Sequence, residues 1–225
     1  MDQTRKKIYF EWDAISWSRA MKIWSKHLQR NKGKYALEIG ARDGGLSLML
    51  AKEYDMEVVC SGIINPKERA QKNHNKHTTN YKIKYATVDC LNIPYEDNTF
   101  NVVIFKSVIG AVASADNQKR ALSEVRRVLK PGGVLLFAEN LNSSFLHTYL
   151  RRKYRPYNSY WRYLELDEIV NFLGMFDLLE LNTTGFFANL TSGRSVKKIA
   201  SYVDRIIERI IPKKLRYIVY GSAVK

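Results

Sequence analysis

The sequence has few cysteines, no long apolar run and no apolar leader. Its two cysteines, Cys60 and Cys90, lie far apart without a Cys-x-x-Cys spacing, so we expect neither a disulfide framework nor a metal site. The start, Met1 to Phe10, is charged and lacks the apolar core of a signal peptide. The longest clean apolar stretches, 102–105 and 134–138, fall far short of the roughly 20 residues that span a bilayer. These absences predict a cytoplasmic protein.

Acidic residues are also scarce, at 22 Asp and Glu against 37 Lys and Arg, which gives a formal net charge of +15. Such an excess suggests an anionic partner, such as nucleic acid, a membrane surface or a phosphorylated substrate. The excess is uneven along the chain: residues 1–34 hold nine basic and three acidic residues, residues 35–140 fourteen and twelve, and residues 141–225 fourteen and seven. The pattern favours a nearly neutral core with basic flanks over a domain that coats nucleic acid.

Hydrophobic periodicity predicts the order of the elements. Short apolar or alternating runs predict strands at 35–40, 57–61, 82–89, 100–105, 134–138, 176–181 and 217–224. Helical spacing predicts helices at 13–28, 46–53, 66–76, 121–129, 167–173 and 195–211. Strands that alternate with helices through the first five units predict an α/β fold with a doubly wound, mostly parallel sheet.

A glycine turn follows the first expected strand, at the sheet edge where such folds bind ligands. With Gly40 as the first and Gly45 as the third glycine of a dinucleotide fingerprint, the second position holds Arg42. A large side chain there argues against NAD or FAD, and the Gly-Lys-Ser/Thr ending of a Walker A loop is absent. A glycine turn that binds nothing remains an alternative at this point.

The run Glu38-Ile39-Gly40-Ala41-Arg42-Asp43-Gly44 resembles the first motif of class I S-adenosylmethionine-dependent methyltransferases, Glu/Asp-x-Gly-x-Gly-x-Gly. Segments 88–103 and 121–133 are similar to later parts of the same family, so the resemblance covers about 35–140. It implies a seven-stranded Rossmann-like sheet with an antiparallel edge strand, and S-adenosylmethionine as cofactor. We interpret 1–225 as one domain with an N-terminal helical segment (1–34), a cofactor-binding core (35–140) and a substrate-side, basic region (141–225).

The resemblance also implies a set of cofactor-binding positions. They are Glu38, Gly40, Ala41, Arg42, Gly44, Gly62, Ile63, Asp89, Cys90 and Lys106. Asp89 falls where the family places an acid that accepts a hydrogen bond from the adenine amino group, although an Asp there also suits a turn cap.

Three positions depart from the family pattern. Arg42 replaces a glycine, and neither Gly62 nor Ile63 supplies the acid that usually ends strand two and binds both ribose hydroxyls. Three outcomes follow from the missing acid: weak cofactor binding, another ribose partner such as Asn65, or lost activity. Lys106 would place a cation near a cationic sulfonium, so we expect it to turn outward or to contact substrate.

Acceptor chemistry is less clear from the sequence. Glu139, His147 and Asp116 are weak candidates for a general base, and each also suits a structural role. Residues 151–163 interleave aromatics with cations and suit a lid that binds sugar rings or phosphate, or else a solvated linker. Helix 195–211 has an isoleucine-rich face and a basic edge, which predicts packing on the sheet or contact with a membrane surface.

The leading hypothesis is an S-adenosylmethionine-dependent methyltransferase that acts on a small molecule, with a sugar or phosphate-bearing glycan intermediate as a plausible acceptor. The resemblance extends to methyltransferases of bacterial surface-polysaccharide synthesis. An RNA methyltransferase is the first alternative, because of the net charge. A non-catalytic protein with a degenerate cofactor site is the second, because of Arg42 and the missing ribose acid.

Overall fold

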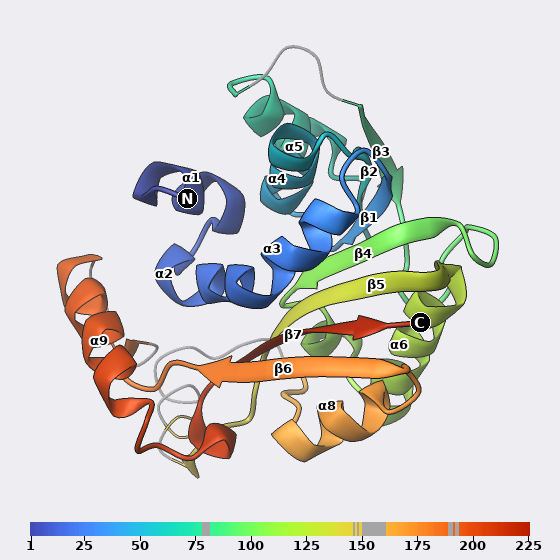
Figure 1. The fold of residues 1–225 in the computed structure, drawn as a ribbon. Coiled ribbons are helices and arrows are strands. Elements are labelled where there is room, and N and C mark those ends of the chain that lie inside the picture. Colours follow the sequence, from blue (N-terminus) through green and yellow to red (C-terminus); the bar gives the residue numbers. More distant parts are fainter. Residues whose placement is uncertain (78–81, 146, 148, 150–160, 189–190, 192–193) are drawn as a thin grey trace.

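The seven strands form one mixed sheet in the order β3-β2-β1-β4-β5-β7-β6 (Figure 1). The computed structural model describes all residues except 78–81, 146, 148, 150–160, 189–190 and 192–193. The strands are β1 (Tyr35–Ile39), β2 (Glu57–Gly62), β3 (Ile83–Thr87), β4 (Phe100–Lys106), β5 (Leu129–Asn140), β6 (Leu178–Thr184) and β7 (Ile218–Val224). Strands β1 to β5 pair in parallel, and β7 runs antiparallel between β5 and β6. The expected Rossmann-like sheet with an antiparallel edge is thereby confirmed.

Helices cover both faces of this sheet. The main ones are α1 (Gln3–Phe10), α2 (Ala14–Trp17), α3 (Met21–Arg30), α4 (Gly45–Tyr54), α5 (Lys67–His74), α6 (Ala115–Val128), α8 (Leu166–Leu173) and α9 (Arg194–Ile207). Helices α3 and α4 lie on one face, and α6 and α8 on the other (Figure 1). Neighbouring residues in a strand contribute to opposite faces, as Ala36 and Leu37 do in β1. This two-sided burial explains why the central strands β1 and β4 read as nearly continuous apolar runs.

Several predicted boundaries were wrong. Helix α1 was not expected, because three of its eight residues are charged and its apolar residues are the last three, without helical spacing. The single helix expected at 13–28 is divided into α2, a 3-10 turn at Ser18–Ala20, and α3. The turn expected at 130–133 is part of β5, where the register with β4 shifts. In the described part of the chain, no helix is both long and apolar enough to cross a membrane.

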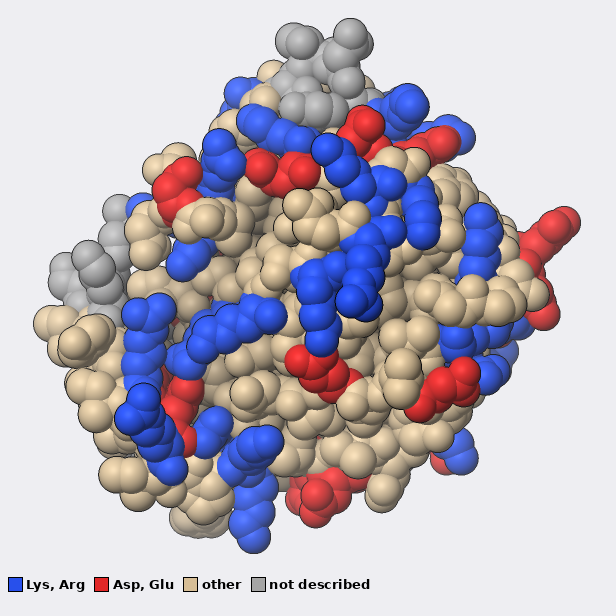
Figure 2. Space-filling view, in the orientation of Figure 1, with Lys and Arg blue, Asp and Glu red and all other residues tan. Residues whose placement is uncertain are grey.

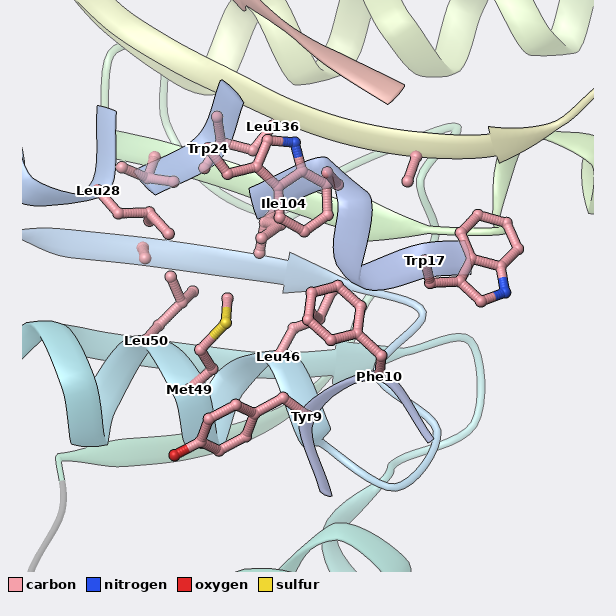
Figure 3. Close-up of a cluster of buried hydrophobic side chains, with 14 of the residues drawn as sticks. Tyr9, Phe10, Trp17, Trp24, Leu28, Leu46, Met49, Leu50, Ile104 and Leu136 are labelled. Carbon is pink, nitrogen blue, oxygen red and sulfur yellow. The ribbon is translucent and has the colours of Figure 1, made fainter. Parts of the chain in front are cut away.

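Trp24 fixes α3 to the sheet. Its ring is fully buried and stacks on Phe10 at a centroid distance of 6.1 Å (Figure 3). Its indole Nε1–H donates to the carbonyl oxygen of Gly221 in β7, at 2.9 Å. The same residue therefore joins α1, α3 and the antiparallel part of the sheet.

We expect Trp24→Phe to destabilise the fold by about 1–2 kcal/mol, because a buried carbonyl loses its donor while the aromatic packing is largely kept. For a chain of this size, the loss corresponds to a fall of roughly 2–8 °C in melting temperature. Calorimetry measures the shift, and Tyr202→Phe, at a side chain 64% exposed, is the control. Equal shifts in the two variants would contradict a structural role for the indole bond.

Candidate functional site

The loop between β1 and α4 has the conformation that its glycines predict. Gly40 and Gly44 adopt φ of 69° and 72°, in the left-handed region that favours glycine. A Cβ on Gly40 would lie 2.5 Å from Cγ2 of Val108, and one on Gly44 would lie 2.4 Å from Nε2 of His74. The loop is thus closed in by side chains from two other segments. Arg42, at the position of the family's second glycine, keeps a left-handed φ of 49° and is exposed.

Glu38 holds the start of α4 next to this loop through hydrogen bonds of its side chain. Its side chain is buried, and its Oε2 accepts hydrogen bonds from the Ser47 backbone N–H at 2.8 Å and from the Ser47 hydroxyl at 2.5 Å. Burial raises the pKa of Glu38 to about 8, against the lowering effect of the Ser47 bonds. The residue links β1 to the first turn of α4. Its contact with a cofactor stays a prediction.

Lys106 corrects one expectation, because it does not turn outward. The residue is 7% exposed, and its Nζ donates to the Phe10 carbonyl oxygen at 2.7 Å. The ammonium lies 3.3 Å from the centroid of the Trp12 ring, which is a cation–π contact. Burial lowers the pKa of Lys106 to about 8. The cation at the end of β4 is therefore enclosed by the segment that follows α1.

That covering segment, residues 10–13, was missed in the sequence. The carboxyl group of Glu11 faces Lys106 and Arg42, its Oε2 is buried without a hydrogen-bond partner, and burial raises its pKa. A Cβ on Gly45 would lie 2.4 Å from the Tyr9 carbonyl oxygen, so the end of α1 needs glycine at this point of α4. The available signals were the aromatic run Tyr9-Phe10-Glu11-Trp12 and the second of two adjacent glycines.

Backbone strain gathers around the same cluster. Glu11, Asp13, Arg42 and Ser107 all have positive φ, between 45° and 58°. Each such conformation costs a non-glycine residue roughly 1–3 kcal/mol and tends to occur at functional sites. The four residues come from three segments that meet at the carboxyl ends of β1 and β4. The backbone strain therefore points to the carboxyl ends of β1 and β4 as a functional site, and this evidence does not depend on the sequence motif.

The neighbouring edge, at the end of β2, offers no acid for a ribose. Ile63 and Ile64 are 68% and 82% exposed, and Gly62 carries no side chain. Asn65, the expected substitute, uses its Oδ1 to accept the Lys67 backbone N–H at 2.9 Å at the start of α5. The acid that the family usually has at the end of strand two is therefore missing in the structure as well, and residues 62–65 do not replace it.

Asp89 and Cys90 follow β3 on the same side of the sheet. Asp89 is exposed, and its Oδ1 accepts the Leu91 backbone N–H at 2.9 Å, which is the turn-capping role that we weighed against adenine binding. Cys90 is buried, and burial raises the pKa of its thiol to about 11. Because the Asp89 carboxylate is exposed, the cap is compatible with a further contact to a ligand.

The candidate base Glu139 is fully buried at the end of β5. Its Oε2 accepts the backbone N–H groups of Val108 and Ile109, both at 2.7 Å, and its Oε1 accepts that of Asn140 at 2.9 Å. Burial raises the pKa of Glu139 to about 7. The geometry gives Glu139 a positioning role, since it holds Val108 against Gly40.

His147 and Asp116 are not brought to the glycine loop. His147 is buried, with Nδ1 2.8 Å from the Ser144 hydroxyl and Nε2 2.6 Å from the Phe186 carbonyl oxygen. Asp116 lies exposed in the first turn of α6. A catalytic role for either residue stays a prediction.

Most of the aromatic and basic segment 151–163 lies outside the described residues. Of its described part, Arg162 hydrogen-bonds the side chains of Gln118 and Glu168 and donates its backbone N–H to the Gly110 carbonyl oxygen at 2.8 Å. The end of this segment is thus fastened to α6 and α8. The expected substrate lid at 151–160 lies outside the described residues and stays a prediction.

Comparison with known proteins finds similarity over about half of the chain. Residues 37–137, a little under half of the chain, match the family model described as a methyltransferase domain. A demethylmenaquinone methyltransferase from Staphylococcus haemolyticus is 30% identical over 52% of this chain and 50% of its own length. A 2-phytyl-1,4-naphtoquinone methyltransferase from Nostoc punctiforme is 29% identical over 53% of this chain and 47% of its own. The chain spans about half the length of these curated relatives.

Solved structures agree on the fold. A phosphoethanolamine N-methyltransferase 2 from Haemonchus contortus, in complex with S-adenosyl-L-methionine, covers 99% of this chain and 56% of its own, with a TM-score of 0.65 and 17% identity. A putative methyltransferase from Bacillus halodurans covers 92% of this chain and 99% of its own, with a TM-score of 0.63 and 16% identity. A [4+2]-cyclase, SpnF, has the same TM-score of 0.63 and 16% identity. The fold is thus shared by enzymes of different chemistry.

Proposed function

We propose that this chain, which carries a class I methyltransferase domain, transfers a methyl group from S-adenosylmethionine to a small-molecule acceptor. The observation that carries the proposal is the cluster at the carboxyl ends of β1 and β4. There the left-handed loop 40–45, buried Lys106 and partnerless Glu11 Oε2 come together. Both quinone methyltransferases named above act, by name, on small molecules, which supports the class of acceptor.

The charges of this cluster suit the methionine half of the cofactor. The ammonium of the cofactor needs an acceptor, and Oε2 of Glu11 is a buried carboxylate oxygen that accepts no hydrogen bond. The carboxylate of the cofactor needs donors, and Lys106 and Arg42 are cations of the same cluster. On the adenosine side, the exposed Asp89 carboxylate suits an exocyclic amine. The residues present therefore fit the cofactor, except at the ribose hydroxyls.

The chain's own contribution would be alignment and exclusion of water, since the bound cofactor supplies the reactive methyl group. Trp12 covers Lys106 and stacks on Arg42 at 4.9 Å, so the covering segment shields the cluster. Glu139 holds the turn after β4 in place. The basic flanks support an acceptor that carries negative charge, and we keep a sugar or phosphate-bearing glycan intermediate as the finer proposal.

Calorimetric titration with S-adenosylhomocysteine tests the cofactor. We expect binding that Asp89→Ala weakens about tenfold, since a hydrogen bond to a charged group contributes about 1.5 kcal/mol. Asp177→Ala, at an exposed acid just before β6, is the matched control and should bind as the wild type does. Absence of binding heat at high protein concentration, or an Asp89→Ala variant with unchanged affinity, would refute the proposal.

Two alternatives make different predictions. A non-catalytic role, favoured by the missing acid at Gly62 and Ile63, predicts a co-crystal with S-adenosylhomocysteine that shows no cofactor density. An RNA acceptor predicts RNA binding whose affinity falls steeply with salt, because counterions are released from the phosphates. A small-molecule methyltransferase predicts cofactor binding without such a salt-dependent RNA complex.

A further inference from the structure

Helix α9 and the turn after it have an inverted distribution of polar and apolar side chains. The side that packs on the protein carries Ser201, Asp204 and Glu208, all buried. Asp204 accepts the backbone N–H groups of residues 186, 187 and 188 at 2.7–3.1 Å. Glu208 pairs with the Arg19 guanidinium at 2.5 Å. The helix is therefore held to the protein by acids rather than by an apolar face.

The apolar side of α9 faces solvent. Its members, spaced by three or four residues, form a stripe from the start of the helix into the turn after it: Val196 (54% exposed), Ile199 (66%), Val203 (37%), Ile206 (61%) and Ile210 (83%). Tyr202, 64% exposed, flanks the stripe. The expectation that this face packs on the sheet was wrong, because the acids and not the isoleucines meet the protein.

Cations border the apolar stripe. Arg205 in α9 and Arg209 just after the helix are exposed, and Lys213 and Lys214 are exposed after Pro212. Figure 2 shows Lys and Arg side chains gathered where α9 lies in Figure 1. A helix with an apolar stripe and a cationic border matches an anionic lipid surface, where the stripe enters the headgroup region and the cations meet the lipid charges.

We propose that α9 docks this protein on an anionic lipid bilayer, with Ile199, Val203 and Ile206 inserted and Arg205 and Arg209 at the headgroups. The cations beside the stripe favour a lipid surface over a second copy of the chain as the partner of α9. Two stripes packed together would bring the cationic borders of both copies side by side, where they repel. The inference does not rest on the proposed methyl transfer.

The position of α9 would bring the bilayer to the functional edge of the sheet. The helix contacts α2, and the Arg19–Glu208 pair joins it to the N-terminal helices next to the covering segment (Figure 1). A protein docked through α9 would therefore have the carboxyl ends of its parallel strands near the lipid. Acceptors dissolved in, or anchored to, the bilayer become accessible in that arrangement.

Vesicle flotation tests the proposal with the full chain. We expect co-flotation with vesicles of phosphatidylcholine and phosphatidylglycerol, and at least tenfold weaker partitioning onto phosphatidylcholine alone. Ile199→Ser/Ile206→Ser leaves the net charge unchanged and should weaken partitioning onto the anionic vesicles at least tenfold. Arg205→Ser/Arg209→Ser should weaken it similarly. The matched control is Leu178→Ser, at an apolar side chain 68% exposed on β6.

Several outcomes would overturn the proposal. Partitioning of the isoleucine variant equal to that of the wild type would show that net charge alone causes binding. Equal binding to both kinds of vesicle would remove the role of the cations. A dimer in sedimentation equilibrium that dissociates in the isoleucine variant would identify a second copy as the occupant. Unchanged melting temperatures, expected for exposed positions, keep the comparison free of unfolding.

Discussion

Gly44→Ala is expected to destabilise the protein by about 3 kcal/mol and to reduce binding of S-adenosylhomocysteine at least tenfold. The new Cβ would lie 2.4 Å from Nε2 of His74 and 2.8 Å from Cβ of Ala70. His74 has little freedom to move, because its Nε2 donates to the Gly44 carbonyl oxygen and its Nδ1 accepts from the Tyr85 hydroxyl, both at 2.8 Å. A left-handed alanine adds about 1–2 kcal/mol and overpacking about 1–3 kcal/mol.

Gly132→Ala separates these two costs. Gly132 has the same φ of 72°, but a Cβ added there would meet no other atom within 4 Å, so only the left-handed strain remains. We expect it to lose about 1–2 kcal/mol, with unchanged cofactor binding. The melting temperatures of the two variants should therefore differ by about 2–8 °C. Coincident melts would mean that His74 yields freely, and that close packing at Gly44 does not shape the loop.

The second large effect is a gain. Gly62→Asp or Ile63→Asp should tighten binding of S-adenosylhomocysteine by about 10- to 100-fold, because a carboxylate that accepts both ribose hydroxyls contributes about 1.5–3 kcal/mol. A Cβ on Gly62, which is buried, would lie 3.1 Å from the Ile64 carbonyl oxygen, so the backbone at Ile64 must yield slightly to admit an acid there. Ile63 is 68% exposed and accepts an acid with little rearrangement.

Ile64→Asp is the control for this gain, because it adds the same charge one residue further along at a side chain 82% exposed. Calorimetry should give the tighter complex for one of the first two variants and not for Ile64→Asp. Three variants with wild-type affinity would place the ribose elsewhere. Three variants with equally increased affinity would point to a general effect of the added negative charge and not to a contact with the ribose hydroxyls.

The centre of the sheet could be predicted from the sequence because its strands β1 and β4 are buried on both faces and end at clear turns. Residues 35–39 and 100–106 read as apolar runs, and the glycines at 40 and 44 mark the loop between β1 and α4. The glycine turn was predicted at the carboxyl end of β1 for the same reason, and the structure places it there. The left-handed conformation of Gly40 and Gly44 is a local property of the backbone, and it can be predicted from the glycines themselves.

The covering segment and the direction of α9 depend on distant contacts, so local pattern did not reveal them. Lys106 is buried only because residues 10–12 return across the edge of the sheet. An apolar stripe in the sequence predicts that a helix has an apolar face, but it does not predict whether that face packs on the protein or faces solvent. In α9, the deciding residues were Asp204 and Glu208, whose partners are backbone amides at 185–188 and the side chain of Arg19.

The place of β7 in the sheet has a consequence for synthesis on the ribosome. β7 follows β6 in the chain but lies between β5 and β6, so β6 has no sheet partner until β7 has been made. Tyr217, just before β7, also donates its hydroxyl to the Asp13 carboxylate at 2.9 Å, beside the covering segment. The emerging chain must therefore keep β6 unpaired, and the edge that Tyr217 joins unfinished, until β7 has followed β6.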